Sequence, residues 1–161
     1  MFAAAQATVD RLRACWRGGG EHSLGGATKR VNFSAWSPSG GDVAVVSSDG
    51  LVRVYDAQRA ALTDEHRASK DAAVAVCWQP TGGRGRSSRA EHVLACVGSD
   101  AHLVVLDRRA RQAVADVPTG QLCTNVVWAA DDSVVCRDVD GAVRVVDARA
   151  WAVARRITKF E

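Results

Sequence analysis

A short pattern that recurs three times limits what this chain can fold into. An aspartate is followed seven residues later by a second aspartate, with mostly apolar residues between them. The copies run from Asp49 to Asp56, from Asp100 to Asp107 and from Asp140 to Asp147. Asp-Gly or Asp-Ala between apolar runs predicts a tight hairpin turn, because glycine tolerates positive φ and aspartate bonds its own turn amides. We therefore expect these six aspartates to stabilise turns, and a β-strand to join each pair.

A tryptophan precedes each copy of the pattern, at Trp36, Trp78 and Trp128. The distance from tryptophan to the closing aspartate is 20 residues in the first copy, 29 in the second and 19 in the third. The second distance is longer because the segment GGRGRSSRAE is inserted there. An identical place in each repeat predicts tryptophans that pack between the repeats, and exposed recognition residues are the alternative.

Each repeat is expected to form four antiparallel strands. A valine-rich second strand is expected over Val43–Val46, Val93–Val97 and Val134–Cys136, and a weaker fourth over roughly Ala60–Asp64, Ala113–Asp116 and Ala152–Ile157. Four strands in units of roughly 40 residues predict an all-β, propeller-like fold. The expected organisation is a poorly structured segment with a glycine-rich link over 1–30, then three units within 31–161, at about 31–66, 72–117 and 121–158.

Several short segments of the repeats resemble the WD-repeat family in their order and spacing. They are AWSP (Ala35–Pro38), SSDG (Ser47–Gly50), CWQP (Cys77–Pro80), GSDA (Gly98–Ala101) and DVDG (Asp138–Gly141). The resemblance covers about residues 31–158. It implies the blades of a β-propeller and a protein that binds other proteins without catalysing a reaction.

The repeats also depart from the WD-repeat pattern. The closing Trp-Asp pair of the family is replaced by Tyr55-Asp56, Leu106-Asp107 and Val146-Asp147. The family's Gly-His pair is missing; in the second copy Ser69 falls at its register, and His66 lies three residues early. The family's buried Asp–His–Ser–Trp network is therefore expected to be incomplete, so that the turn aspartates act without a histidine partner.

Three blades do not close a ring, and the rings of this family usually have seven. Open repeats leave strand edges and apolar faces that need a cover. We expect the chain to be the front part of a longer propeller, and completion of the ring by partner proteins is the alternative.

Two segments are more specifically similar to the WD-repeat subunits of the THO mRNA-export complex. These are AVCWQP (Ala75–Pro80) and the closing Lys159-Phe160-Glu161. That resemblance implies a scaffold in nuclear mRNA processing and export, with other proteins of a multi-subunit complex as partners and RNA contacted indirectly. The alternatives are an adaptor in another assembly, an RNA-binding propeller that acts through basic loops, and a cytoplasmic location.

The insertion over Gly82–Arg89 is a candidate contact loop. It brings Arg84, Arg86 and Arg89 into a connection between two strands, where contacts are often made. The three arginines would suit RNA phosphates or an acidic partner, and the serines would suit phosphorylation. An inert insertion is the competing interpretation. The net charge of +3 is small and shows no binding site by itself.

The sequence favours no catalytic, cofactor or metal site. It contains no nucleophile elbow, phosphate loop or catalytic-triad spacing, so we expect neither an enzyme nor a small-molecule substrate. The histidines, His22, His66, His92 and His102, show no ligand spacing. The five cysteines form no CxxC pair, and we expect buried free thiols in a reducing compartment at Cys77, Cys96, Cys123 and Cys136.

The sequence also favours no membrane or secretory segment. It has no run of 18 apolar residues, which a transmembrane helix requires. Met1–Cys15 places its arginines after its apolar part and makes a poor secretory signal. A short mitochondrial presequence would fit the alanine and arginine content there, although Asp10 argues against it. We therefore expect an intracellular protein.

Overall fold

The computed structural model of the chain describes residues 29–80, 92–110, 112–129 and 133–158. Within these ranges it contains twelve strands and no helix. Sheet 1 consists of β1 (Val31–Trp36), β2 (Asp42–Ser47), β3 (Leu51–Asp56) and β4 (Ala61–Arg67). Sheet 2 consists of β5 (Ala73–Trp78), β6 (Val93–Gly98), β7 (His102–Asp107) and β8 (Ala113–Pro118). Sheet 3 consists of β9 (Cys123–Ala129), β10 (Ser133–Asp138), β11 (Val143–Asp147) and β12 (Ala152–Ile157).

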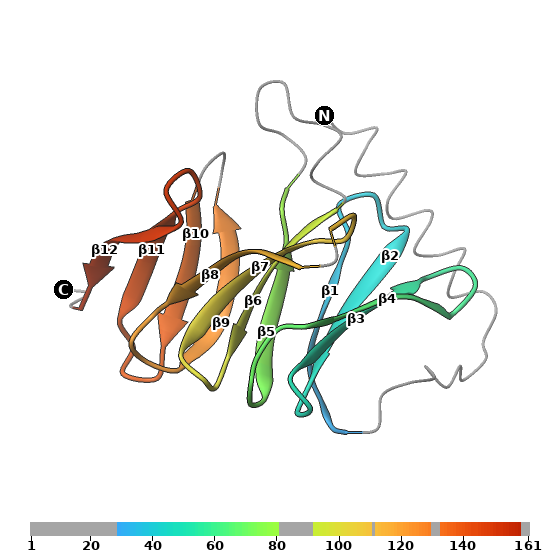
Figure 1. Cartoon of the computed structure of the whole chain (residues 1–161), viewed down its shortest axis with the longest axis horizontal. Coiled ribbons are helices and arrows are strands. Elements are labelled where there is room, and N and C mark those ends of the chain that lie inside the picture. Colours follow the sequence, from blue (N-terminus) through green and yellow to red (C-terminus); the bar gives the residue numbers. More distant parts are fainter. Residues whose placement is uncertain (1–28, 81–91, 111, 130–132, 159–161) are drawn as a thin grey trace.

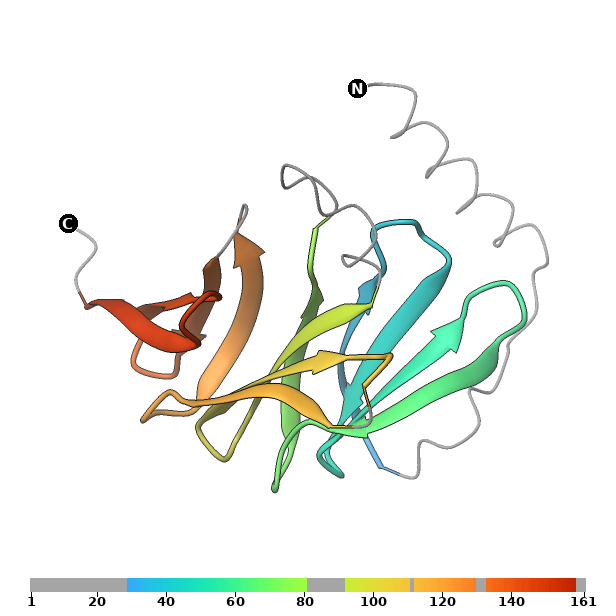
Figure 2. The same ribbon diagram turned by 45° about the horizontal axis from the view of Figure 1, so that its top comes forward.

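Each sheet is an antiparallel meander, with its four strands paired in chain order. The three sheets stand side by side in sequence order and form an open arc (Figure 1). The first strands of neighbouring sheets, β1 with β5 and β5 with β9, contact one another. Sheets 1 and 3 lie at the two ends of the arc (Figure 2). The predicted all-β class is confirmed, and the arrangement is consistent with part of a β-propeller whose ring is not closed.

Two hydrophobic cores fill the spaces between the sheets. The first core joins sheets 1 and 2, and the second core joins sheets 2 and 3. Because successive side chains of a strand point to opposite faces, β6 serves both cores. Leu94 and Cys96 belong to the first core, whereas Ala95 and Val97 belong to the second. Strands β5, β6 and β7 are thus covered on both faces of sheet 2, which explains why they are apolar almost throughout, whereas β8 is mostly exposed.

The turn between the second and third strands has the same backbone conformation in every sheet. Gly50, Ala101 and Gly141 occupy it with φ of 79°, 61° and 82°. The predicted Asp-Gly and Asp-Ala turns are therefore confirmed. Gly50 has a second requirement, since a Cβ atom there would lie 2.3 Å from the carbonyl oxygen of Asp71. Nothing lies within 4 Å of a Cβ atom built on Gly141.

The fourth strand of sheet 1 extends further than predicted. It runs over Ala61–Arg67, where the sequence indicated roughly Ala60–Asp64. Backbone pairing with all of β3 extends it, up to the pairing of Leu51 with Arg67. The residues at its end are polar, so the sequence there lacks the alternation of apolar and polar residues that predicts a strand.

Several predictions fall on residues that the structure does not describe. They concern the N-terminal segment up to residue 28, the insertion with Arg84, Arg86 and Arg89, and Lys159–Glu161. Among the residues that it does describe, no helix is long and apolar enough to cross a membrane.

Candidate interaction surface

An ionic cluster joins sheet 2 to sheet 1. Arg108, directly after β7, donates from Nε to Oδ2 of Asp64 at 2.6 Å and from Nη1 to Oδ2 of Asp42 at 2.7 Å. A longer bond, of 3.2 Å, reaches Oγ1 of Thr63. Burial disfavours the charged guanidinium, but the bonds to Asp42 and Asp64 outweigh it and raise the pKa of Arg108. The two sheets are therefore held by charge as well as by apolar packing.

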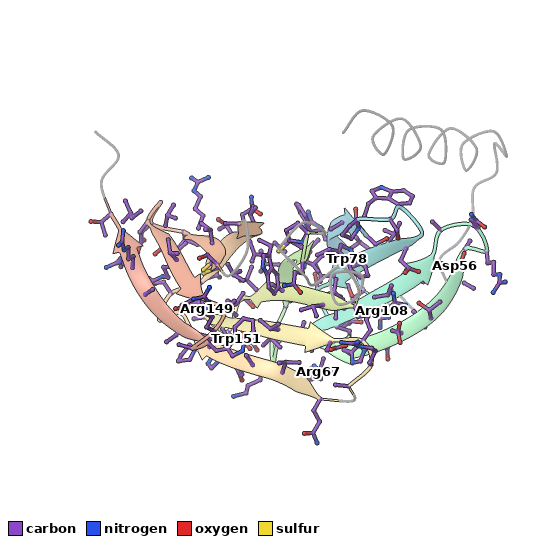
Figure 3. All side chains as sticks on the ribbon, turned by 90° about the horizontal axis from the view of Figure 1, so that it is seen from above. Asp56, Arg67, Trp78, Arg108, Arg149 and Trp151 are labelled. Atoms are coloured by element: carbon purple, nitrogen blue, oxygen red, sulfur yellow. The ribbon has the colours of Figure 1, made fainter. Side chains whose placement is uncertain are left out.

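Trp78 completes the same junction. Its Nε1 donates to the carbonyl oxygen of Ala35 in sheet 1 at 2.9 Å. The guanidinium carbon of Arg108 lies 5.7 Å from the centre of the Trp78 ring, a cation–π arrangement (Figure 3). The indole is 6% exposed and lies in the first core, between sheets 1 and 2.

The junction between sheets 2 and 3 is apolar where the first junction is ionic. Ala148, directly after β11, packs against the second core together with Val93 and Ala115. Trp128 is 7% exposed and meets Trp151 edge to face, with ring centres 6.4 Å apart. The buried Nε1 of Trp128 has no hydrogen-bond partner among the described residues. The residue directly after the third strand therefore forms ion pairs at the first junction, as Arg108, and packs among aliphatic side chains at the second, as Ala148.

Trp36 does not follow the other two tryptophans. It is 45% exposed and belongs to neither core. Trp78 and Trp128 each face the preceding sheet, whereas Trp36 lies in sheet 1, which no other described sheet precedes. Trp36 therefore packs against no other described sheet, and its blade-packing role stays a prediction.

The first aspartate of each pattern has a different role in each sheet. Asp49 follows the prediction: its Oδ1 accepts from the Leu51 amide and the Ser47 hydroxyl. Its Oδ2 accepts from Nη2 of Arg53 at 2.9 Å. Burial favours the neutral carboxyl, yet the hydrogen bonds from Arg53, Ser47 and Leu51 lower the pKa of Asp49 to about 2.

Asp100 and Asp140 depart from that prediction. Asp100 accepts a bond from the amide of Lys70, in the connection between sheets 1 and 2, at 2.9 Å. Asp140 is exposed, and its carboxylate bonds no other described residue. In sheet 3 the turn is capped instead by Asp138, which accepts from the Ala142 amide at 2.8 Å. Asp138 also pairs with Arg144 at 2.9 Å, and its carboxylate is fully buried.

The closing aspartates behave alike in all three sheets. Asp56, Asp107 and Asp147 each accept a bond from the amide two residues later, at 2.9, 3.0 and 2.7 Å. This is the turn-stabilising contact expected from the sequence. Asp107 is also held by the Arg109 side chain, whose hydrogen bond outweighs burial and lowers the pKa of Asp107 to about 2.

The four cysteines expected to be buried are free thiols, with Cys96, Cys123 and Cys136 buried and Cys77 partly buried. Burial raises the pKa of Cys77 to about 12, and that of Cys96 as well. Cys123 and Cys136 share a hydrogen bond that lowers the pKa of Cys123 to about 7 and raises that of Cys136. These thiols are packed in the cores.

The described histidines are dispersed. His66 lies on β4, His92 precedes β6, and His102 on β7 pairs with Asp116 on β8. Among the described residues, no three histidine, cysteine, aspartate or glutamate side chains gather as a metal site would require. His22 lies outside those residues.

The outer strands differ in charge from one end of the arc to the other. The positions of Asp64 and Glu65 on β4 correspond, by pairing with the third strand, to Arg155 and Arg156 on β12. On sheet 3, Arg155 helps to line an open hollow of about 480 Å³ with Arg149 and the apolar Val145 and Ile157. Figure 3 shows Arg149 at this end of the arc. Sequence reasoning missed this surface, because it emerges only when the outer strands are compared position by position.

No protein-family model matches the chain, and no curated protein matches it either. The WD-repeat and THO resemblances therefore stay predictions from the sequence.

Proposed function

We propose that this protein is a non-catalytic interaction scaffold of the WD-repeat type. The observation that carries the proposal is the outer face of sheet 3. There Val127 is 55% exposed and Ile157 is 41% exposed, beside the arginine-lined hollow. An exposed apolar area bordered by charged side chains is typical of a protein–protein contact. The repeated sheets supply the rigid frame that such a contact requires.

The more specific form of the proposal is a subunit of a THO-type complex in nuclear mRNA processing and export. It is supported by the sequence resemblance of AVCWQP (Ala75–Pro80) and by the sheet repeat in which that segment lies. The partners would be other proteins of the complex, with RNA contacted indirectly. A WD-repeat adaptor of another assembly shares the first part of the proposal and differs in the partner.

Affinity capture tests the partner. The tagged full chain, expressed in the nucleus of its own cells, is expected to retain helical THO subunits after nuclease treatment of the extract. Their absence, with other proteins retained, would leave the general scaffold and remove the THO assignment. Retention of no protein above the background of the tag would contradict the scaffold itself.

Direct RNA binding is the second candidate, and the exposed Arg155 and Arg156 of β12 favour it. It predicts that the purified chain binds a single-stranded oligoribonucleotide with a steep dependence on salt. Arg155→Glu should then weaken binding, whereas Arg59→Glu, an exposed change in sheet 1, should have a smaller effect. A scaffold that contacts RNA only indirectly predicts weak binding that neither substitution changes.

A further inference from the structure

One transverse row of side chains marks the face that each sheet turns toward the following sheet. Strand pairing places Ala35, Ala44, Val54 and Asp64 side by side across sheet 1. The matching row of sheet 2 is Cys77, Ala95, Val105 and Ala115. The matching row of sheet 3 is Val127, Val135, Val145 and Arg155. The first three positions are apolar or thiol-bearing in every sheet, and the fourth changes from acidic to small to basic.

The following sheet contributes one particular residue to this end of the junction. That residue comes directly after the closing aspartate of the third strand. It is Arg108 in sheet 2, where it pairs with Asp64 of sheet 1 at 2.6 Å. It is Ala148 in sheet 3, where it packs on the second core with Ala115 of sheet 2. The carboxylate of Asp64 is thus paired with a guanidinium, whereas Ala115 and Ala148 both pack against the second core.

The row of sheet 3 ends in a cation, and its two end residues are exposed while Val135 and Val145 are partly buried. Val127 is 55% exposed, and Arg155 lines the hollow on this face. Two neighbouring positions of sheet 3 also differ in charge from the corresponding positions of sheet 1, where one side chain is acidic and the other neutral. Ser133 replaces Asp42 as the residue paired with the closing aspartate, and Arg149 stands where sheet 1 has Gln58. Among the described residues, those that line the hollow on sheet 3 therefore include two arginines, Arg149 and Arg155, and one aspartate, Asp147.

We propose that this face receives a further four-stranded sheet, from outside residues 1–161, that presents an aspartate or glutamate carboxylate to Arg155. The carboxylate would occupy the position that Arg108 has in sheet 2, and aliphatic side chains of the same sheet would cover Val127 and Val145. The inference rests on the proposed scaffold function and defines the chemistry of one contact that the scaffold makes.

A second copy of this chain does not fit that description. The residue of sheet 1 that would approach Arg155 is Ala57, the residue directly after Asp56. It offers no carboxylate to Arg155. Sedimentation of the purified chain should therefore show a monomer at micromolar concentration. A dimer that Arg155→Glu dissociates would identify a second copy as the occupant and overturn the proposal.

The charge preference is tested by extending the full chain with a docking sheet of known geometry. A second copy of residues 72–118, joined after Glu161, supplies strands β5 to β8 again. Residues 158–161 and Ala72 then separate β12 from the appended β5, which equals the five residues, 68–72, between β4 and β5. Three versions of the appended copy are compared: unchanged, Arg108→Gln and Arg108→Glu. Docking is measured as protection of Ala154→Cys, in the hollow, from a maleimide reagent.

The Arg108→Glu copy is expected to slow maleimide labelling at least about fivefold relative to the unchanged copy, the size of one partly buried ion pair. The Arg108→Gln copy should be intermediate. In chains that also carry Arg155→Asp the order should reverse, and the unchanged copy then serves as the control that an appended sheet folds and docks.

Equal labelling with all three copies, or strongest protection by the unchanged copy against Arg155, would overturn the proposal. Lack of protection in every combination, the charge-reversed one included, would overturn it too. Neither outcome affects affinity capture of partners by the full chain, so the failure of this inference and that of the scaffold function are distinguishable.

Discussion

The guanidinium of Arg108 lies 2.7 Å from Oδ2 of Asp42, a residue 66 positions away in the neighbouring sheet. The same guanidinium also bonds Asp64, so one side chain neutralises two carboxylates. At the next junction the corresponding residue is Ala148, which packs with apolar side chains. The sheets of this chain thus share one geometry and differ in the chemistry that joins them.

Removing Arg108 should weaken the chain measurably. Arg108→Met is expected to lower the free energy of unfolding by about 2 kcal/mol, because Asp42 and Asp64 would face each other without a cation. Urea unfolding followed by tryptophan fluorescence measures the change. Arg109→Met is the control, since Arg109 is 49% exposed and its loss should change stability much less than the loss of Arg108. Equal losses in both variants would contradict an inter-sheet role for Arg108.

The positive-φ residues in the three turns between second and third strands should respond differently to substitution. Gly141→Ala should cost about 1 kcal/mol from backbone strain alone, because its surroundings are open. Gly50→Ala should cost more than about 3 kcal/mol, since the added Cβ collides with the carbonyl oxygens of Ser69 and Asp71. Ala101→Gly, at φ 61°, should stabilise the fold by about 0.5–1 kcal/mol. Thermal unfolding of the three variants would show this order, and similar losses for the two alanine variants would contradict it.

Trp36 and Trp78 should differ in their contribution to stability although their sequence positions correspond. Trp78→Ala is expected to cost about 3–5 kcal/mol through the lost core volume and the lost bond to Ala35. Trp36→Ala should cost less than about 1 kcal/mol, because that indole is 45% exposed. Chemical denaturation gives both values. A loss at Trp36 as large as that at Trp78 would show that Trp36 is packed in solution.

The pairing of Asp49 with Arg53 should be visible in the response to acid. The pKa of Asp49 lies at about 2, below its ordinary value of 3.8, so the ionised carboxylate stabilises the folded state. That stability is fully present above pH 3.8 and is lost as the pH falls toward 2. Arg53→Met should raise the pKa of Asp49 in an NMR titration. Asp107, held by Arg109, is the internal control and should keep its pKa of about 2. An unchanged Asp49 titration in the variant would contradict the pairing.

Asp138 should contribute more to the stability of the fold than Asp140, the aspartate that the sequence pattern indicates. Asp138→Asn is expected to cost about 3 kcal/mol, because it leaves the nearly buried Arg144 without its carboxylate. Asp140→Asn should change stability by less than about 0.5 kcal/mol, since Asp140 is exposed. The two midpoints of urea unfolding test the assignment. The reverse order would restore Asp140 as the residue that caps the turn.

The strands were predictable because each depends on local pattern. Alternating apolar residues and an Asp-Gly or Asp-Ala turn determine a hairpin without reference to the rest of the chain. The closing aspartates were predictable for the same reason, since Asp56 bonds amides two and three residues away.

The inter-sheet contacts were not predictable from the same patterns. Arg108 meets Asp42 only because the sheets stand side by side, and nothing near Arg108 in the sequence marks it. The exposure of Trp36 follows from the place of sheet 1 in the arc, not from its motif. In the turn of sheet 3, Asp138 stands where sheet 1 has Ser47 and takes both the turn amide and the buried Arg144, so the cap lies two residues from the expected aspartate.

The two cores also determine how this chain should unfold. Every described residue of the first core comes from sheets 1 and 2 or the link between them, and every described residue of the second core from sheets 2 and 3 or their links and turns. Cooperativity between the ends of the chain must then pass through sheet 2, as in a linear array with nearest-neighbour coupling. Amide hydrogens of β3 and β11 should exchange in separate opening events, while those of β6 should exchange only when both ends are open.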